Sequence, residues 1–190
     1  MIEFFNYLNA IQPLSPEATS ALLKVVRVKE LRRGQVMLRD GEVCDKLTFV
    51  VKGLLKLYFE TGTKEVVIRL AKENNFLLSA QSYYLQSGSD FSIRAIEDCI
   101  VLNIVINDLQ FLLSRNPELY IHLLAIAQQQ VAAFEQQIAM LLLPARERFE
   151  RLSKEEPWLT EGSRITDKLL AAYIGVRANT VCVWRKGKRL

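Results

Sequence analysis

One long stretch bounded by prolines constrains the fold more than any other part of the sequence. Pro117–Leu143 contains neither Gly nor Pro after its first residue, and Pro144 follows it. Because proline suits the first turn of a helix and interrupts its interior, the stretch predicts a continuous helix of about 26 residues. No run of 18 uninterrupted apolar residues occurs in the chain, so we expect no segment to span a membrane.

Six apolar residues recur along this helix at heptad spacing, three and four positions apart in turn, which places them along one edge. They are Leu124, Ala127, Val131, Phe134, Ile138 and Leu141. We expect the polar side to carry Gln128, Gln129, Gln130, Glu135, Gln136 and Gln137. The helix could lie on its own domain along the apolar edge, or two copies could pair there. We favour a homodimer, because strand-like sequence precedes the helix and a separate helical unit follows it.

The sequence before the long helix predicts two short helices and then strands. Residues 2–26 predict the helices, the second capped by Ser15 with Pro16 in its first turn. From Val28 to Val105, turn residues separate short β-rich runs, and a hairpin is expected around Gly62. The expected strands are Gln35–Leu38, Lys46–Val51, Leu54–Phe59, Glu65–Leu70, Phe91–Ile96 and Ile100–Ile104. Strands at this spacing suit a small sandwich, barrel or roll, and Asn107–Ser114 predicts a further short helix.

The sequence after Pro144 predicts a small helical unit. Ala145–Leu152 reads as one helix, and Thr166 is expected to cap a second, which Gly175 ends. A third helix is expected from about Arg177 through Arg185. Residues 145–190 hold 11 Lys or Arg against 6 Asp or Glu, whereas residues 1–144 hold 14 against 15. This basic end of the chain favours nucleic acid as a partner, although a solvated tail has the same composition.

The cysteines and the amino-terminal residues indicate the cellular compartment in which we expect the protein. The three cysteines lie far apart without a C-x-x-C pair, so the sequence predicts neither a disulfide framework nor a metal site. The first residues, MIEFFNYLNAIQ, lack the basic region of a secretory signal. We therefore expect a cytoplasmic protein.

Several patterns, taken in order, resemble the Crp/Fnr (catabolite activator / fumarate-nitrate regulator) family of bacterial transcription regulators over essentially the whole chain. They are Leu31–Gln35, Asp40–Glu42, Phe49–Lys56, Ala95–Cys99, Asn116–Leu119, Ile165–Thr166 and Ala171–Val176. The resemblance implies an α+β protein in three parts. These are a cyclic-nucleotide-binding-like β-roll (a jelly-roll-like, double-stranded β-helix) with amino-terminal helices over residues 1–116, a dimerisation helix over 117–143 and a helix-turn-helix domain over 144–190. The implied partners are double-stranded DNA, a second copy of the chain, RNA polymerase and a small-molecule effector, with no membrane.

The resemblance also places the effector pocket, where the sequence departs from the family. Members that bind cyclic AMP carry a Gly-Glu pair and an Arg-Ser or Arg-Thr pair. Here Leu78-Ser79 stand in the first place, and Ser89 with Asp90 in the second. A cyclic phosphate needs a cation or converging N–H donors, and a neighbouring carboxylate repels it. The sequence thus argues against cyclic nucleotides, and it lacks the cysteine cluster of the iron–sulfur members. We expect no cofactor, an effector of unknown identity, and a pocket lined by Leu78, Ser79, Ala80, Ser89 and Asp90.

In the DNA-binding unit the resemblance makes the last helix the recognition helix, with its amino end in the major groove. Ala178, Asn179 and Val183 take the base-facing positions, where Asn can pair with adenine and methyl groups can contact thymine. Family members usually carry arginine in place of Val183, so their preferred DNA sequence does not transfer. The expected phosphate contacts are Thr166, Arg177, Thr180, Arg185, Lys186 and Lys188. If the helices were only a small structural unit, Val181 and Trp184 would be its core.

An alternative function is a ligand-binding or protein-interaction module whose DNA unit has lost specificity. The departures at Val183 and in the pocket motivate it. We expect no enzymatic activity, because the only histidine, His122, has no identifiable Ser or Cys partner and a lone helical histidine is usually structural.

Overall fold

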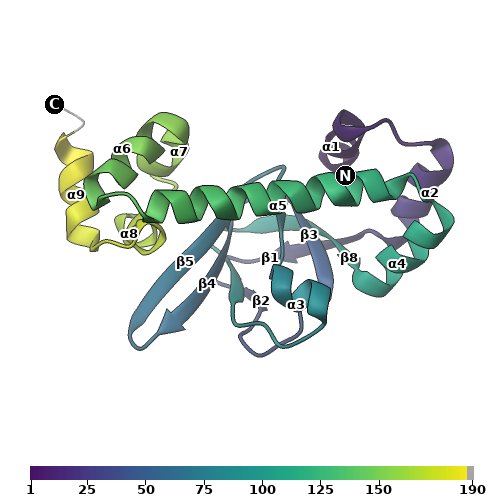
Figure 1. Ribbon diagram of the computed structural model, residues 1–190, viewed down its shortest axis with the longest axis horizontal. Coiled ribbons are helices and arrows are strands. Elements are labelled where there is room, and N and C mark those ends of the chain that lie inside the picture. Colours follow the sequence, from purple (N-terminus) through teal and green to yellow (C-terminus); the bar gives the residue numbers. More distant parts are fainter. Residues whose placement is uncertain (188–190) are drawn as a thin grey trace. The chain divides into compact units, whose positions relative to one another are not determined.

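The computed structural model describes residues 1–187, which form an α+β fold (Figure 1). The helices are α1 Ile2–Ile11, α2 Pro16–Val25, α3 Ala80–Leu85, α4 Ile106–Arg115, α5 Leu119–Leu141, α6 Ala145–Glu155, α7 Pro157–Thr160, α8 Asp167–Ile174 and α9 Ala178–Gly187. The strands are β1 Arg27–Leu31, β2 Val36–Leu38, β3 Lys46–Lys52, β4 Leu55–Thr61, β5 Lys64–Ala71, β6 Phe76–Leu77, β7 Ser92–Ala95 and β8 Cys99–Val105. No helix among these residues is long and apolar enough to cross a bilayer.

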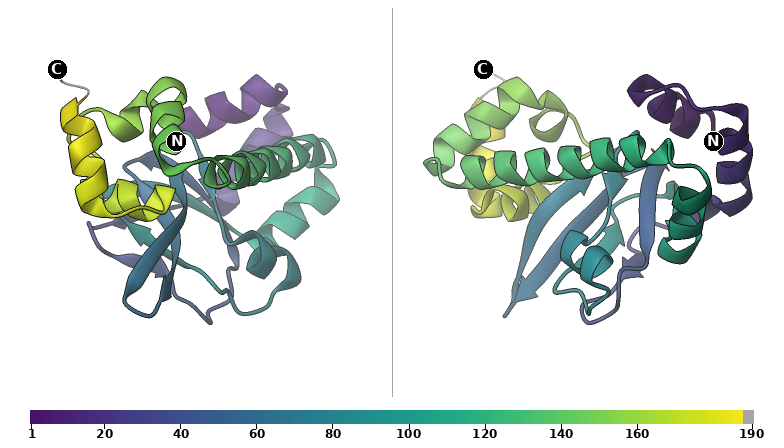
Figure 2. Two further views of the ribbon diagram at one scale, coloured as in Figure 1. Left: turned by 60° about the vertical axis from the view of Figure 1, so that its left-hand side comes forward. Right: turned by 45° about the vertical axis from the view of Figure 1, so that its right-hand side comes forward.

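The described strands form two four-stranded sheets, in the orders β1-β8-β3-β6 and β2-β7-β4-β5. In the first sheet β8 pairs antiparallel with both β1 and β3, with Val101 opposite Lys29 on one side and Val50 on the other. In the second, β2 pairs antiparallel with β7. The hairpin of β4 and β5 is drawn in blue in Figures 1 and 2, and Gly62 at its tip has φ +59. The predicted hairpin is therefore present.

The turn between β3 and β4 requires glycine at position 53. Gly53 has φ +98, and a Cβ built there would lie 2.6 Å from the Sγ atom of Cys99 and 2.7 Å from the carbonyl oxygen of Asp98. Both the backbone conformation and the close approach exclude a side chain. Glu73, which is not part of the turn, stabilises it: its carboxylate accepts a hydrogen bond of 2.9 Å from the Gly53 amide.

The chain divides into two compact units. The first comprises Met1–Leu57 and Leu70–Ala132; the second comprises Tyr58–Arg69 and Ala133 onward. In the first unit, four rings from α1, β3 and β6 form an edge-to-face cluster with centroids 5.0 to 6.3 Å apart. These rings belong to Phe4, Tyr7, Phe49 and Phe76. Such pairs add to the stability gained from burial, so the cluster anchors α1 on the first sheet.

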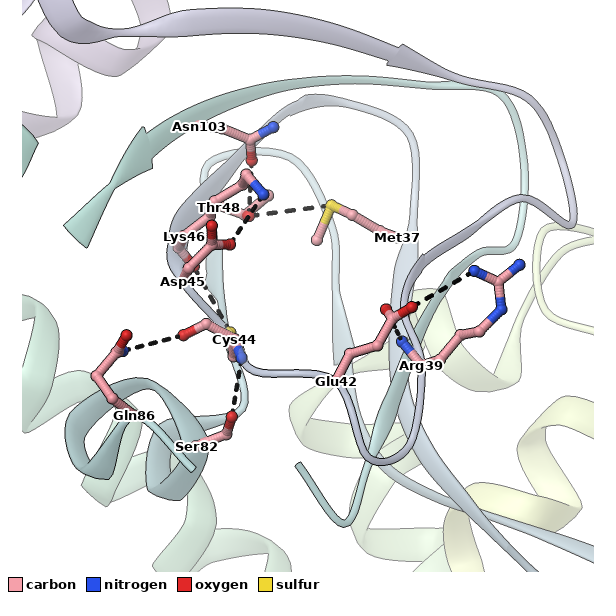
Figure 3. Close-up of polar contacts among 10 residues, drawn as sticks. All are labelled: Met37, Arg39, Glu42, Cys44, Asp45, Lys46, Thr48, Ser82, Gln86 and Asn103. Carbon is pink, nitrogen blue, oxygen red and sulfur yellow. Dashed lines mark hydrogen bonds and ion pairs between the residues drawn. The ribbon is translucent and has the colours of Figure 1, made fainter. Parts of the chain in front are cut away.

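The loop before β3 is attached to α3, as Figure 3 shows. The amide nitrogen of Cys44 donates to the hydroxyl of Ser82 at 2.8 Å, and the side chain of Gln86 donates to the Cys44 carbonyl at 3.5 Å. Burial raises the pKa of the Cys44 thiol. A buried thiol with a raised pKa is unreactive, so Cys44 has a structural role here.

The second unit has its own core of buried side chains from α6 to α9. Phe149, Leu159, Leu170, Ile174 and Val181 are each fully buried. Helix α8 begins at the predicted cap, where the hydroxyl of Thr166 accepts a hydrogen bond of 3.2 Å from the Leu169 amide. The helix ends at Gly175, which has φ +70, and the next amide, of Val176, returns to the carbonyl of Ala171. This is the left-handed glycine termination expected from the sequence.

Candidate nucleic-acid interface and effector site

Helix α9 presents one exposed side and one buried side. Val181 is fully buried, and Trp184 packs beside Phe149 with ring centroids 5.4 Å apart. Asn179 and Val183, four residues apart and therefore on one side of the helix, are exposed, and Val183 is 67% accessible. Ala178, at the start of the helix, is half-buried. The structure thus places Asn179 and Val183 on the exposed side of α9 and Ala178 at its first position.

The predicted phosphate-binding residues differ in their exposure. Thr166, Arg177 and Lys186 are exposed, and Thr180 is half-buried. The Thr166 hydroxyl accepts a hydrogen bond as the helix cap, yet its own proton remains available for donation. Lys188 lies outside the described residues.

The guanidinium of Arg185 is largely buried in the second unit and is hydrogen-bonded there, which differs from the sequence-based prediction. Its side chain is only 14% exposed. Nη1 donates to the carbonyl of Ile165 and to the Oδ1 atom of Asp167, both at 2.8 Å, and Nη2 donates to the carbonyl of Leu159 at 2.9 Å. The prediction that Arg185 contacts phosphate is therefore wrong for this structure. Arg185 instead holds α9 to the start of α8.

Replacing Arg185 with alanine is expected to lower the free energy of unfolding of this unit by about 3 kcal/mol. The change removes the partner of Asp167 and the donor to two carbonyls, and breaking a largely buried ion pair has an effect of this size. Urea denaturation followed by tryptophan fluorescence measures it, because both tryptophans, Trp158 and Trp184, belong to this unit. Lys186→Ala, an exposed neighbour, should change stability by less than about 0.5 kcal/mol. Equal effects of the two variants would contradict the assignment.

Helix α5 exposes a line of apolar side chains. Leu124, Val131 and Ile138 are spaced by seven residues and are 58%, 58% and 61% exposed. Ala127, Phe134 and Leu141, the other members of the predicted heptad, are half-buried on one flank. The guanidinium of Arg69 lies 5.8 Å from the ring centroid of Phe134. The predicted heptad edge is thus exposed at Leu124, Val131 and Ile138 and half-buried at Ala127, Phe134 and Leu141.

The opposite side of α5 is buried and contains polar residues that the sequence analysis placed outward. Gln130 and Gln137 are each 7% exposed. Gln130 donates to the carbonyl of Phe76 at 3.5 Å, and Gln137 donates to the carbonyl of Tyr173 at 3.2 Å. Their expected place on the solvated face was wrong. A buried glutamine is tolerated where its amide bonds to a main-chain carbonyl, and its position in the heptad does not reveal that partner.

A second side chain, from α6, joins the end of α8 to the segment between α5 and α6 within the second unit. Arg148, which the sequence analysis did not single out, donates from Nε to the carbonyl of Leu143 and from Nη1 to the carbonyl of Ile174, both at 2.8 Å. Gln137 attaches the last turn of α8 to α5 directly, through the carbonyl of Tyr173, and Arg148 of α6 attaches it to the segment that follows α5. No local pattern in the sequence signals these contacts, because each acceptor is a backbone carbonyl distant along the chain.

The residues predicted to line the effector pocket lie where β6 leads into α3 and before β7. Leu78, Ser79 and Ser89 are buried, Ala80 is half-buried and Asp90 is exposed. The hydroxyls of Ser79 and Ser89 are hydrogen-bonded to each other at 2.8 Å, and the Ser89 hydroxyl also donates to the carbonyl of Phe91. The hydrogen bond between the two serines therefore joins the segment that follows β6 to the segment that precedes β7. Among the described residues, no group of His, Cys, Asp and Glu is arranged to hold a metal ion.

Comparison with known proteins shows which family the chain resembles. Residues 28–116 match the family model of the cyclic nucleotide-binding domain. Similar solved structures include CLP of Xanthomonas campestris, described as a c-di-GMP responsive global regulator, with 17% identity over 92% of each chain and a TM-score of 0.72. FixK2 of Bradyrhizobium japonicum has 15% identity over 86% of this chain and 84% of that one, with a TM-score of 0.72. A regulator of the crp/fnr family from Eubacterium rectale has 14% identity over 94% of this chain and 85% of that one, with a TM-score of 0.70.

The resemblance to the Crp/Fnr family is confirmed. At these identities the likeness to Crp/Fnr structures establishes the fold, and the α+β architecture with antiparallel sheets agrees with the expectation. Comparison with curated proteins finds no match.

Proposed function

We propose that the chain is a homodimeric, sequence-specific DNA-binding transcription regulator of the Crp/Fnr type. The observation that carries the proposal is the exposed side of α9. An apolar residue and an amide, Val183 and Asn179, face solvent there, while Val181 and Arg185 fix the helix from behind. Helix α9 is thus packed against its own unit on one side and exposes polar and apolar side chains on the other. Such a helix suits insertion into a DNA major groove.

Helices α8 and α9 act in this proposal as a helix-turn-helix. Their connection, Gly175–Arg177, is short, and its left-handed glycine sets the direction of the second helix. Arg177 is exposed at the amino end of α9, the end that enters the groove in this motif. Ala178, Asn179 and Val183 would contact bases, and Thr166, Arg177, Thr180 and Lys186 would contact phosphates. Lys188 remains a proposed phosphate contact.

The exposed line on α5 supports the dimer. Leu124, Val131 and Ile138 stand opposite the buried face of the helix, and their heptad spacing is the one that pairs helices side by side. Ala127, Phe134 and Leu141 would border the interface. Two recognition helices related by a two-fold axis would then read half-sites about 34 Å apart. An enzymatic role has no support in the site, whereas RNA polymerase is the partner that a regulator of this type would contact.

The β-roll is proposed to sense an effector other than cyclic AMP. Leu78 and Ser79 replace the pair that holds the ribose in the cyclic-AMP-binding members, and the Ser79–Ser89 hydrogen bond spans the pocket region. Asp90 at its edge would repel a phosphate. An effector would act by binding two arrangements of the dimer helices with different affinity.

Selection of bound sequences from a random pool of duplex DNA tests the proposal. We expect enrichment of a two-fold symmetric site whose affinity falls steeply as salt is raised. Binding without any enriched sequence would favour the alternative, a ligand-binding or protein-interaction module with a degenerate DNA unit. No salt-dependent binding at all would refute DNA recognition.

A further inference from the structure

The amino-terminal half of α9 exposes side chains that carry no charge. The segment Ala178–Trp184 contains no Asp, Glu, Lys or Arg. Its exposed residues are Asn179 and Val183, and Val183 is 67% exposed. Val181, which lies between them in the sequence, is fully buried and fixes the orientation of the helix. In the DNA-binding function proposed above, on which this inference rests, Val183 would therefore face base edges in the major groove.

The cation that follows Val183 most closely is bound within the protein. The guanidinium of Arg185 donates to two backbone carbonyls and to the carboxylate of Asp167. The exposed cation among residues 178–187 is Lys186, which lies nearer the carboxyl end, whereas the amino end enters the groove. Guanine is recognised most often by Arg or Lys, which donate to its O6 and N7 atoms. The turn of α9 that contains Val183 thus presents no cation to a guanine.

The major groove offers an apolar group at only one of the four bases. Guanine, cytosine and adenine present hydrogen-bonding atoms there, whereas thymine presents its 5-methyl group beside the O4 acceptor. A valine placed against a polar edge would remove water from that edge and return no hydrogen bond, which weakens binding. Against the thymine methyl it buries hydrocarbon on both sides. We propose that Val183 contacts the 5-methyl group of one thymine in each half-site and thereby selects T·A over C·G at that position.

Asn179 limits where this thymine lies in the half-site. The two residues are four positions apart, which is about 6 Å along the helix axis. Base pairs follow one another at about 3.4 Å, so the two side chains reach bases about two steps apart. The amide of Asn179 suits the N6 and N7 atoms of an adenine. The thymine selected by Val183 is therefore expected within about two base pairs of an adenine selected by Asn179.

Uracil substitution in the enriched duplex isolates the methyl group, because uracil keeps the base pair and the O4 acceptor. Each thymine is replaced in turn, together with its symmetric counterpart, and the affinity of the full chain is measured by fluorescence anisotropy. We expect one position at which the two lost methyl groups weaken binding about fifteenfold. The factor should not depend on salt, since no phosphate contact is lost. With C·G at that position, 5-methylcytosine should bind about fifteenfold more tightly than cytosine.

Three variants assign the effect to Val183. Val183→Ala shortens the side chain and should bring the thymine and uracil duplexes to within about twofold of each other. Val183→Ile keeps the apolar contact and should preserve the difference, and Lys186→Ala should weaken both duplexes alike. All three residues are exposed positions of α9 at which folding should hardly change, which thermal unfolding checks.

The possible failures of this test are distinguishable. An enriched site without any uracil-sensitive thymine, or a uracil effect that persists in Val183→Ala, would overturn the inference and leave the proposed regulator function standing. A pool from which no sequence is enriched would overturn both.

Discussion

Ile138→Asp should convert the protein from dimer to monomer, raising the dissociation constant of the dimer at least a hundredfold. Burying an isoleucine side chain contributes about 2 kcal/mol, and a symmetric interface loses that contribution twice. The substitution also brings two carboxylates close to the two-fold axis. Because Ile138 is 61% exposed in the single chain, folding of each chain should hardly change. Sedimentation velocity over a range of protein concentrations measures the effect.

Gln136→Asp is the matched control for this result. Gln136 is exposed on the same helix, two residues away and about 160° around the helix axis from Ile138. It introduces the same charge and should leave the dimer intact. A dimer equally strong in both variants would show that the edge of Leu124, Val131 and Ile138 is not the contact between copies.

Arg177→Ala should weaken DNA binding by about a hundredfold and equally for all sequences. A hydrogen bond to a charged group contributes about 1.5 kcal/mol at the low end, and a dimer loses one in each half-site. The slope of log affinity against log salt should become shallower by about 1.8, since two phosphate contacts disappear. Fluorescence anisotropy with specific and scrambled duplexes at several salt concentrations measures both effects.

Two comparisons separate this role from a general effect of charge. Lys154→Ala removes an exposed cation from α6 and should leave affinity nearly unchanged. Asn179→Ala should reduce the preference for the specific duplex over the scrambled one while leaving the salt slope intact. If Arg177→Ala changed specificity and Asn179→Ala changed the salt slope, the assigned roles would have to be exchanged.

Much of the fold could be predicted because the signals are local. Ser15 with Pro16 starts α2, Thr166 caps α8, and Gly175 ends it. The missed elements are β1, β6, α3 and α7, the last a helix of four residues that begins at Pro157. Strand β6 has two residues and α3 has six, too few to show periodicity, while the exposed charges of β1 obscure its pairing with β8.

The site residues were harder to predict because their roles depend on distant partners. Arg185 resembles any cation on a basic helix until Leu159, Ile165 and Asp167 are seen around it. Gln137 resembles a solvated glutamine until the carbonyl of Tyr173 is found beside it. Asn179 and Val183 are exposed, but their base-facing positions were inferred from the family resemblance; helix spacing alone indicates only that the two residues share one side.

The attachment of α8 to α5 by Gln137, and to the segment after α5 by Arg148, has a mechanical consequence for a dimer. Within the second unit, these contacts would make each recognition helix follow the tilt of the last turns of its own α5, from Ala133 to Leu141. Over a lever of roughly 25 Å, a change of about 10° in the crossing angle of the paired helices displaces the far end by about 4 Å. That displacement is close to the rise of one base pair. It is enough to align both recognition helices with the two major grooves of a DNA site, or to move them out of alignment.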